Sequence, residues 1–127
     1  AMERDVMKVA GFGFRKGAGI DSLLAALEAA GGQGGLTRIA TVADKADAEA
    51  FQALADRLAL PVEAVPAETL AWVTVETQSE KSKAMYGTGS VSEAAALIAA
   101  GPKARLLASR VISPDTMATC AIAEAAT

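Results

Sequence analysis

Apolar residues in the first quarter of the chain follow the spacing of a strand and then of a helix. Residues 6–12 form a nearly continuous apolar run that leads into the glycine-rich residues 11–19, which predicts a buried strand ending in a loop. Leucine and isoleucine at i, i+3, i+4 and i+7 then predict a helix that two glycines end. These positions are Ile20, Leu23, Leu24, Leu27, Gly31 and Gly32.

The same strand, loop and helix order occurs a second time. Residues 36–42 predict a strand, residues 41–45 its loop, and Phe51, Leu54, Ala55 and Leu58 one face of a helix that Pro61 ends. Beyond that proline, residues 62–65 predict a third short strand. Residues 68–73 predict a brief helical turn that carries Trp72.

The second half of the chain starts with a polar stretch, residues 76–89, which predicts one long loop. Ser90 and Glu93 then have the spacing of a capping box at the start of an alanine-rich helix, which Gly101 and Pro102 end. Two strand-like runs follow, residues 105–112 and 117–123. The four residues between them are few enough for a hairpin.

This order of elements predicts one α/β domain over residues 1–127. The expected architecture is a three-layer α/β/α sandwich with a mixed, mostly parallel sheet that ends in an antiparallel hairpin. Ligands of such open sheets bind outside the carboxyl ends of the strands. We therefore expect the loops at residues 13–19, 41–45 and 76–90 to converge on a binding site.

Composition narrows the chemistry of that site. The chain has no histidine and one cysteine, Cys120, which excludes a histidine base, a Ser–His–Asp triad, the common zinc sites and an intramolecular disulfide. We expect no metal site and no cofactor, and we expect Cys120 to be a small buried side chain.

The net charge is −3, and the basic pairs are too small to bind a nucleic acid. No apolar run predicts a membrane span, and the expected location is the cytoplasm.

The first candidate site is the turn that contains Gly13, Arg15, Lys16 and Gly17. Glycines let backbone N–H groups approach an anion closely, and the arginine and lysine add two cations in front of the next helix. The turn matches neither a Walker loop nor a full dinucleotide fingerprint. The alternative is a tight turn between strand and helix whose charges are simply solvated.

A second candidate anion site lies where Gly87, Gly89 and Ser90 precede a helix. The alternative there is an ordinary helix cap made by Ser90. Lys45, beside Asp44, either orients a ligand carboxylate or belongs to the first turn of a helix. Trp72 and Phe51 stand in apolar patterns, so both are predicted to lie in the core.

Taken together, these motifs resemble the CobE family, which also occurs as the carboxyl-terminal domain of CbiG. The resemblance covers nearly the whole chain and begins at residues 9–17, Val-Ala-Gly-Phe-Gly-Phe-Arg-Lys-Gly. It continues through Ile39–Ala40–Thr41 with Lys45, residues 58–61, residues 89–97 with Gly101, and residues 119–123. Position 14 departs from the family, because many relatives have cysteine where this chain has Phe14, so no thiol acts there.

The resemblance implies a role in cobalamin biosynthesis at the precorrin stage. The expected ligand is a precorrin-type tetrapyrrole, whose rim of carboxylates suits Arg15, Lys16 and Lys45, and Thr41 joins the expected site with the motif that contains it. One interpretation is a carrier or accessory protein that passes intermediates between corrin-pathway enzymes such as precorrin methyltransferases. The chain lacks room for the amino-terminal region of CbiG, so the stand-alone form is expected.

Two other functions stay open. In CbiG the whole protein opens a precorrin lactone, and a hydrolase of that kind would use Glu93 as general base and Ser90 as an orienting hydroxyl, although both residues equally suit a capping role. Outside the family, the same residues are compatible with a generic α/β domain that binds small anions or nucleotides.

Overall fold

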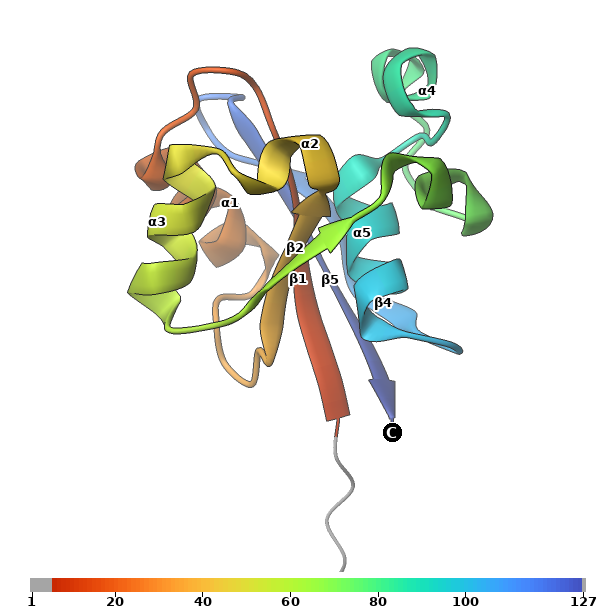
Figure 1. Ribbon diagram of the computed structural model, residues 1–127, viewed down its shortest axis with the longest axis horizontal. Helices are drawn as coiled ribbons and strands as arrows, with labels where there is room; N and C mark the ends of the chain where they lie inside the picture. Colours follow the sequence, from red (N-terminus) through yellow and green to blue (C-terminus); the bar gives the residue numbers. More distant parts are fainter. Residues whose placement is uncertain (1–5, 127) are drawn as a thin grey trace, which may run out of the picture.

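The computed structural model describes residues 6–126, which form one mixed five-stranded sheet (Figure 1). The strand order is β3-β2-β1-β5-β4, in which β1, β2 and β3 run parallel and β5 runs antiparallel to both of its neighbours. The sheet therefore ends in the antiparallel β4–β5 hairpin that the sequence predicts. The strands are β1 (Val6–Phe14), β2 (Arg38–Val42), β3 (Val62–Val65), β4 (Arg105–Ile112) and β5 (Ala118–Ala126).

Helices cover both faces of this sheet and complete the three-layer α/β/α sandwich (Figure 1). One face carries α1 (Ile20–Ala30) and α3 (Glu49–Leu58), and the other carries α5 (Val91–Ala100). Three short elements complete the description: α2 (Ala43–Ala46), the 3-10 helix η1 (Ala67–Trp72) and α4 (Glu80–Tyr86). Both α2 and α4 lie at the edge of the sheet where β1, β2 and β3 end (Figure 1).

The core is divided by the sheet into two apolar clusters. Alternation along β1 sends Val9 to the cluster under α5, whereas Ala10 and Phe12 join the cluster under α1 and α3. Phe12 packs edge-on against Phe51, with ring centroids 5.8 Å apart. Phe51 is fully buried, which confirms the prediction made for it.

The face of β1 toward α5 owes its close packing to a glycine. A Cβ built on Gly11 would lie 2.1 Å from the Ser92 carbonyl oxygen and 2.6 Å from the Ala96 nitrogen. Those atoms belong to the α5 backbone, so the helix lies directly on the strand at this point. Alanines along α5 permit the same approach over the rest of its length, because their side chains are short.

Three local predictions were wrong. The expected loop at residues 41–45 ends in helix α2, and the expected long loop at residues 76–89 contains helix α4, which Ser79 caps by accepting a hydrogen bond from the Ser82 nitrogen. Both helices are short, and α4 has no buried residue, so neither shows an apolar period. Trp72 was predicted to lie in the core but is 76% exposed at the end of η1. Across residues 6–126, no helix is both long and apolar enough to span a membrane.

Candidate functional site

The turn after β1 and the helices after β2 line a cavity that is open to solvent at the carboxyl-end edge of the sheet. The cavity has a volume of about 430 Å³. Arg15, Lys16, Gly17 and Lys45 line it, so the structure brings together four of the residues predicted to bind a ligand. The remaining lining residues are Phe14, Ala18, Asp44, Ala48, Glu49 and Ala50.

Backbone hydrogen bonds fix the shape of the first turn. The Arg15 nitrogen donates to the Met117 carbonyl at 2.9 Å, and the Ala18 nitrogen donates to the Arg15 carbonyl at 3.0 Å. Gly17 has φ +90°, a conformation that is strained for residues with a Cβ. Backbone hydrogen bonds thus hold the turn in place without any contribution from the Arg15 and Lys16 side chains. Both side chains are exposed at the opening of the cavity.

Lys45 is positioned more tightly than the other two cations. Its Nζ donates to the Phe14 carbonyl at 2.6 Å and lies 5.2 Å from the centre of the Phe14 ring. That ring stacks on Phe51 at 5.8 Å with an interplanar angle of 14°, so the ammonium group lies over a half-buried ring that is itself supported by the fully buried Phe51. A lysine has three N–H donors, and the carbonyl uses one of them. The other two are available to an anion in the cavity.

The start of α3 also faces the cavity, a feature that the sequence interpretation missed. Its cap residue, Ala48, has no side chain that could accept from the first N–H groups of the helix. Such free donors at the positive end of a helix favour a bound anion. Helical periodicity locates a helix only approximately, so it did not indicate which end would reach the site. The sequence does offer one signal for these free donors, because the cap position of the helix, Ala48, is not Ser, Thr, Asp or Asn.

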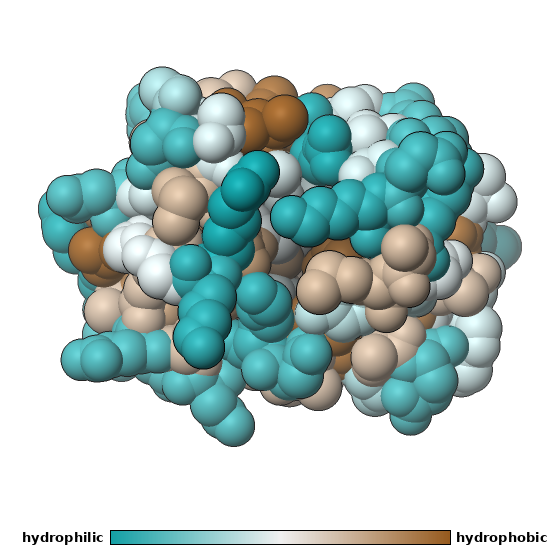
Figure 2. All heavy atoms as spheres, turned by 90° about the horizontal axis from the view of Figure 1, so that it is seen from above, coloured by the Kyte–Doolittle hydropathy of each residue, from teal (hydrophilic) through white to brown (hydrophobic). Residues whose placement is uncertain are grey.

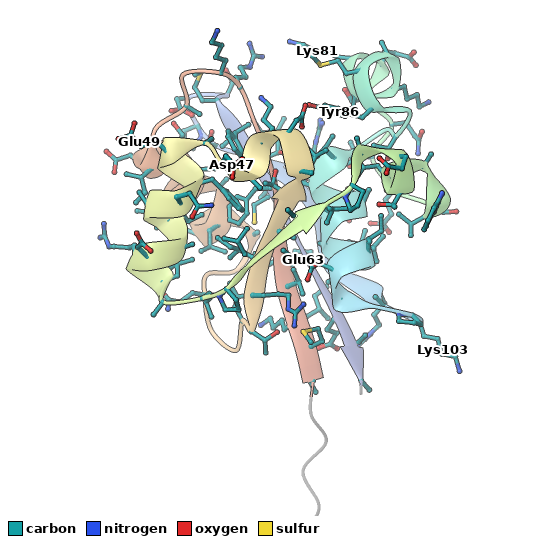
Figure 3. All side chains as sticks on the ribbon, viewed as in Figure 1. Asp47, Glu49, Glu63, Lys81, Tyr86 and Lys103 are labelled. Carbon is teal, nitrogen blue, oxygen red and sulfur yellow. The ribbon has the colours of Figure 1, made fainter. Side chains whose placement is uncertain are left out.

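Two carboxylates lie beside these donors. Asp44 accepts a hydrogen bond from the Tyr86 hydroxyl, with 3.2 Å from Oη to Oδ2. Burial, together with the nearby Asp44 charge, raises the pKa of Tyr86, so the phenol keeps its proton and remains a donor. The Glu49 side chain points outward from α3 (Figure 3). The cavity is therefore lined by three cations and a helix amino terminus against two carboxylates, of which Asp44 already has a donor.

Gly13 and Thr41 lie behind this cavity and do not line it. Thr41 is fully buried, and its Oγ1 donates to the Phe12 carbonyl at 2.8 Å. Gly13 is the next-to-last residue of β1, where a Cβ would lie 2.9 Å from Thr119 Oγ1. Both residues therefore hold neighbouring strands in place, which positions the turn but makes no surface for a ligand.

The second candidate anion site also lies outside the cavity. Gly87 ends α4 with φ +73°, and Gly89 is packed so closely that a Cβ would lie 2.3 Å from the Thr77 carbonyl oxygen. Ser90 is fully buried and caps α5, its Oγ accepting from the Glu93 nitrogen at 3.2 Å. This geometry favours the ordinary helix cap over an anion cradle at these three residues.

Glu93 has a different environment from the one a capping box provides. The Ser90 nitrogen bonds to Thr88 Oγ1 and not to Glu93, so the reciprocal half of the box is absent. The Glu93 carboxylate instead accepts from the backbone nitrogens of Glu76, Thr77 and Arg110 at 2.7, 3.0 and 2.8 Å, and from Thr77 Oγ1 at 2.6 Å. It therefore joins α5, the segment before α4 and strand β4.

These contacts determine the charge of Glu93. Complete burial of the side chain by itself raises its pKa, but the hydrogen bonds from Thr77, Arg110 and Glu76 outweigh burial and lower the pKa below its ordinary value. Glu93 is thus an ionised carboxylate without exposed surface, whose two oxygens are occupied by four donors. This arrangement favours a structural role over proton transfer to or from a ligand.

The thiol of Cys120 is fully buried in β5, as predicted, and burial raises its pKa. It is therefore a protonated core side chain. Within the part of the chain that the structure describes, no three acidic, cysteine or histidine residues gather as a metal ion would require.

Comparison with known proteins gave a family and several similar structures. The family model described as the cobalamin synthesis G C-terminus matches residues 8–123. The crystal structure of CobE, a protein from the cobalamin (vitamin B12) biosynthetic pathway, is 28% identical with a TM-score of 0.84, over 96% of this chain and 93% of CobE. Comparison with curated protein sequences gave no match.

Two further crystal structures share the fold. Cobalamin biosynthesis protein chiG from Agrobacterium tumefaciens str. C58 is 41% identical with a TM-score of 0.68, over 92% of this chain and 97% of chiG. A cobalamin biosynthesis protein G homolog from Sulfolobus solfataricus is 18% identical with a TM-score of 0.70, over 94% of this chain but 37% of the homolog. At 18% identity, the likeness to the Sulfolobus solfataricus protein shows a shared fold and nothing more.

Proposed function

The chain belongs to the family of the cobalamin synthesis G C-terminus, and from this membership we propose that it binds an anionic precorrin-type tetrapyrrole at the carboxyl-end edge of its sheet. Membership and the likeness to CobE and chiG make it a protein of cobalamin biosynthesis. The proposed role is that of a carrier or accessory factor, which holds an intermediate between the enzymes that modify the ring.

One observation carries the proposal: three cations from two separate segments of the chain line one cavity. Arg15 and Lys16 come from the turn after β1, and Lys45 comes from α2 after β2. A precorrin presents several acetate and propionate carboxylates at its rim, and charge-assisted hydrogen bonds to such groups contribute about 1.5–3 kcal/mol each. Contacts of exposed side chains contribute less, because water and salt screen them. Three contacts and the α3 amino terminus together support micromolar binding.

A carrier agrees better with this geometry than a hydrolase does. The candidate base, Glu93, is buried under four hydrogen bonds, and Ser90 is buried as a helix cap. Neither lines the cavity that holds the cations. We therefore assign them to the framework of the site, and propose that the ligand leaves the protein chemically unchanged.

The test is a titration with hydrogenobyrinic acid, a stable corrinoid that has free carboxylates, followed by absorbance and by mass spectrometry of the ligand. The Arg15→Ala/Lys16→Ala variant is expected to bind about 30-fold more weakly than the wild type, because it loses two charge contacts worth about 2 kcal/mol together. The matched control, Arg57→Ala/Lys103→Ala, removes the same charge from exposed positions outside this cavity and is expected to bind like the wild type.

Each other result selects a different function. A change in ligand mass on incubation with a lactone-bearing intermediate identifies a hydrolase. Competition by a nucleotide at lower concentration than the corrinoid identifies a general anion-binding domain. If the two double variants bind the corrinoid with equal affinity, the cavity lined by Arg15 and Lys16 is not the binding site.

A further inference from the structure

Helix α4 forms a second wall above the carboxyl-end edge of the sheet, beside the cavity already described. The turn at residues 15–19 and α4 rise on opposite sides of this edge, with α2 between them (Figure 1). Seen from above, the surface between them is hollowed, with rows of hydrophilic side chains along its sides and hydrophobic atoms visible in its floor (Figure 2). The cavity, which residues of the turn, α2 and the start of α3 line, thus lies beside a hollow that α4 borders.

This wall is fixed although α4 buries none of its own residues. Before the helix, Glu93 holds the backbone nitrogens of residues 76 and 77, and the Ser79 nitrogen donates to the Gly89 carbonyl at 2.8 Å. At the end of the helix, the Tyr86 hydroxyl donates to Asp44, which lines the cavity. A solvent-exposed helix that is anchored at both ends has a defined position, and its last anchor is a residue of the binding site.

One cation of α4 points into the hollow. The Lys81 side chain extends from α4 toward the side of the molecule that carries the 15–19 turn (Figure 3). Lys83 is also exposed, but two positions along a helix correspond to a rotation of about 200°, so it projects from a different face. Lys81 therefore extends toward the 15–19 turn, whereas Lys83 projects from a different face of α4.

We propose that Lys81 is a ligand-binding residue, which contacts a carboxylate on the edge of the ligand opposite to the edge held by Arg15, Lys16 and Lys45. This inference rests on the proposed function and deepens it, because it requires a ligand with carboxylates on at least two edges. Such a polycarboxylate spans the hollow from the turn to α4. A small anion with a single carboxylate binds the cavity and leaves Lys81 in solvent.

The experiment compares Lys81→Ala with Lys83→Ala in the hydrogenobyrinic acid titration. Both variants lose one exposed lysine from the same helix, so they have the same net charge and a similar effect on folding. Lys81→Ala is expected to weaken binding about fivefold, the value for one partly screened ion pair, and Lys83→Ala is expected to bind like the wild type. Lys81→Arg is expected to restore most of the affinity, because it restores the charge.

The results distinguish this inference from the proposal on which it rests. If Lys81→Ala and Lys83→Ala bind equally well while Arg15→Ala/Lys16→Ala binds weakly, the cavity binds the ligand and Lys81 does not. If the wild type itself does not bind, both the proposed function and this inference are wrong. Inorganic phosphate is the second probe: an equal effect of Lys81→Ala on phosphate and on the corrinoid overturns the requirement for a spanning ligand.

Discussion

Glu93 shows how one ionised side chain can organise a site without touching a ligand. Its carboxylate is fully buried, and its four donors come from residues 76 and 77 on one side and from Arg110 in β4 on the other. Residues 76 and 77 lead into α4, so the position of that wall depends on this carboxylate. A buried charge is costly unless its hydrogen bonds are complete, and here each oxygen has two donors.

The variant Glu93→Gln is expected to lose about 2–4 kcal/mol of unfolding free energy at pH 7, because an amide offers one acceptor oxygen and turns an N–H₂ group toward donors. Urea denaturation measures this loss. Glu68→Gln is the control, since Glu68 is exposed on η1, and it is expected to change stability by less than about 0.5 kcal/mol. A loss in Glu93→Gln no larger than in the control contradicts the structural role.

The same carboxylate gives the protein a pH dependence with a definite sign. The pKa of Glu93 is lower in the folded state than its ordinary value of 4.5, so the folded state favours the ionised form. Its contribution is complete above pH 4.5 and is lost as pH falls below it. The stability difference between wild type and Glu93→Gln should therefore shrink as the medium is acidified from pH 6 toward about pH 3. A difference that grows on acidification contradicts the assignment.

Some site residues could be predicted from the sequence because their place follows from a local rule. Arg15, Lys16 and Lys45 each follow a strand that the apolar pattern locates, and parallel strands end at the same edge. The partners of Glu93 could not be predicted in this way. Thr77 and Arg110 lie 16 and 17 residues away, in segments that only the folded chain brings together. The spacing from Ser90 to Glu93 correctly predicted the serine cap and incorrectly predicted the reciprocal bond.

At the scale of elements, the contact between β1 and α5 positions the first turn of the site. Gly11 lies three residues before the end of β1, and α5 rests on it at backbone distance. Atoms of a helix backbone cannot move aside as a flexible side chain can, so a methyl group here must displace the whole helix. The glycine is therefore required by the packing of two elements, and its role differs from that of the turn glycines.

Gly11→Ala is accordingly expected to destabilise the protein by about 2–4 kcal/mol, at or above the upper end of the usual cost of overpacking. Thermal and urea denaturation give the value. Gly34→Ala is the matched control, because Gly34 has ordinary φ and a Cβ there would meet nothing within 4 Å. The control is expected to be neutral or slightly stabilising. Equal stability of the two variants would show that α5 does not lie on β1 as closely as the structure has it.

Elements with an apolar period were the ones that the sequence located well. Helices α1, α3 and α5 and strands β1, β2 and β5 bury one face or both, and burial requires apolar residues at a regular spacing in the sequence. Helix α4 has no buried residue and is held by contacts at its two ends, so its sequence, Glu-Lys-Ser-Lys-Ala-Met-Tyr, shows no apolar period. The same reason made residues 76–89 look like a loop. The wall that we propose to bind the ligand therefore had no hydrophobic signal.

At the scale of the whole molecule, an acidic protein is proposed to bind an acidic ligand. The net charge of −3 repels a polycarboxylate at long range, whereas Arg15, Lys16 and Lys45 attract it at contact. Charges separated by more than the Debye length, about 10 Å at 0.1 M salt, are largely screened from each other. The change of affinity with salt concentration therefore shows whether long-range repulsion or attraction at contact controls binding.

Raising the salt concentration from about 0.05 M to about 0.5 M is expected to weaken the binding of hydrogenobyrinic acid about fivefold, because contact attraction between exposed cations and carboxylates is screened. In Arg15→Ala/Lys16→Ala the dependence should become shallower, since fewer contacts remain to be screened. A corrinoid whose carboxylates are all amidated serves as the control and should bind weakly at every salt concentration. Binding that strengthens with salt would mean that long-range repulsion outweighs the local cations, and the cavity would then lose its electrostatic basis as a tetrapyrrole site.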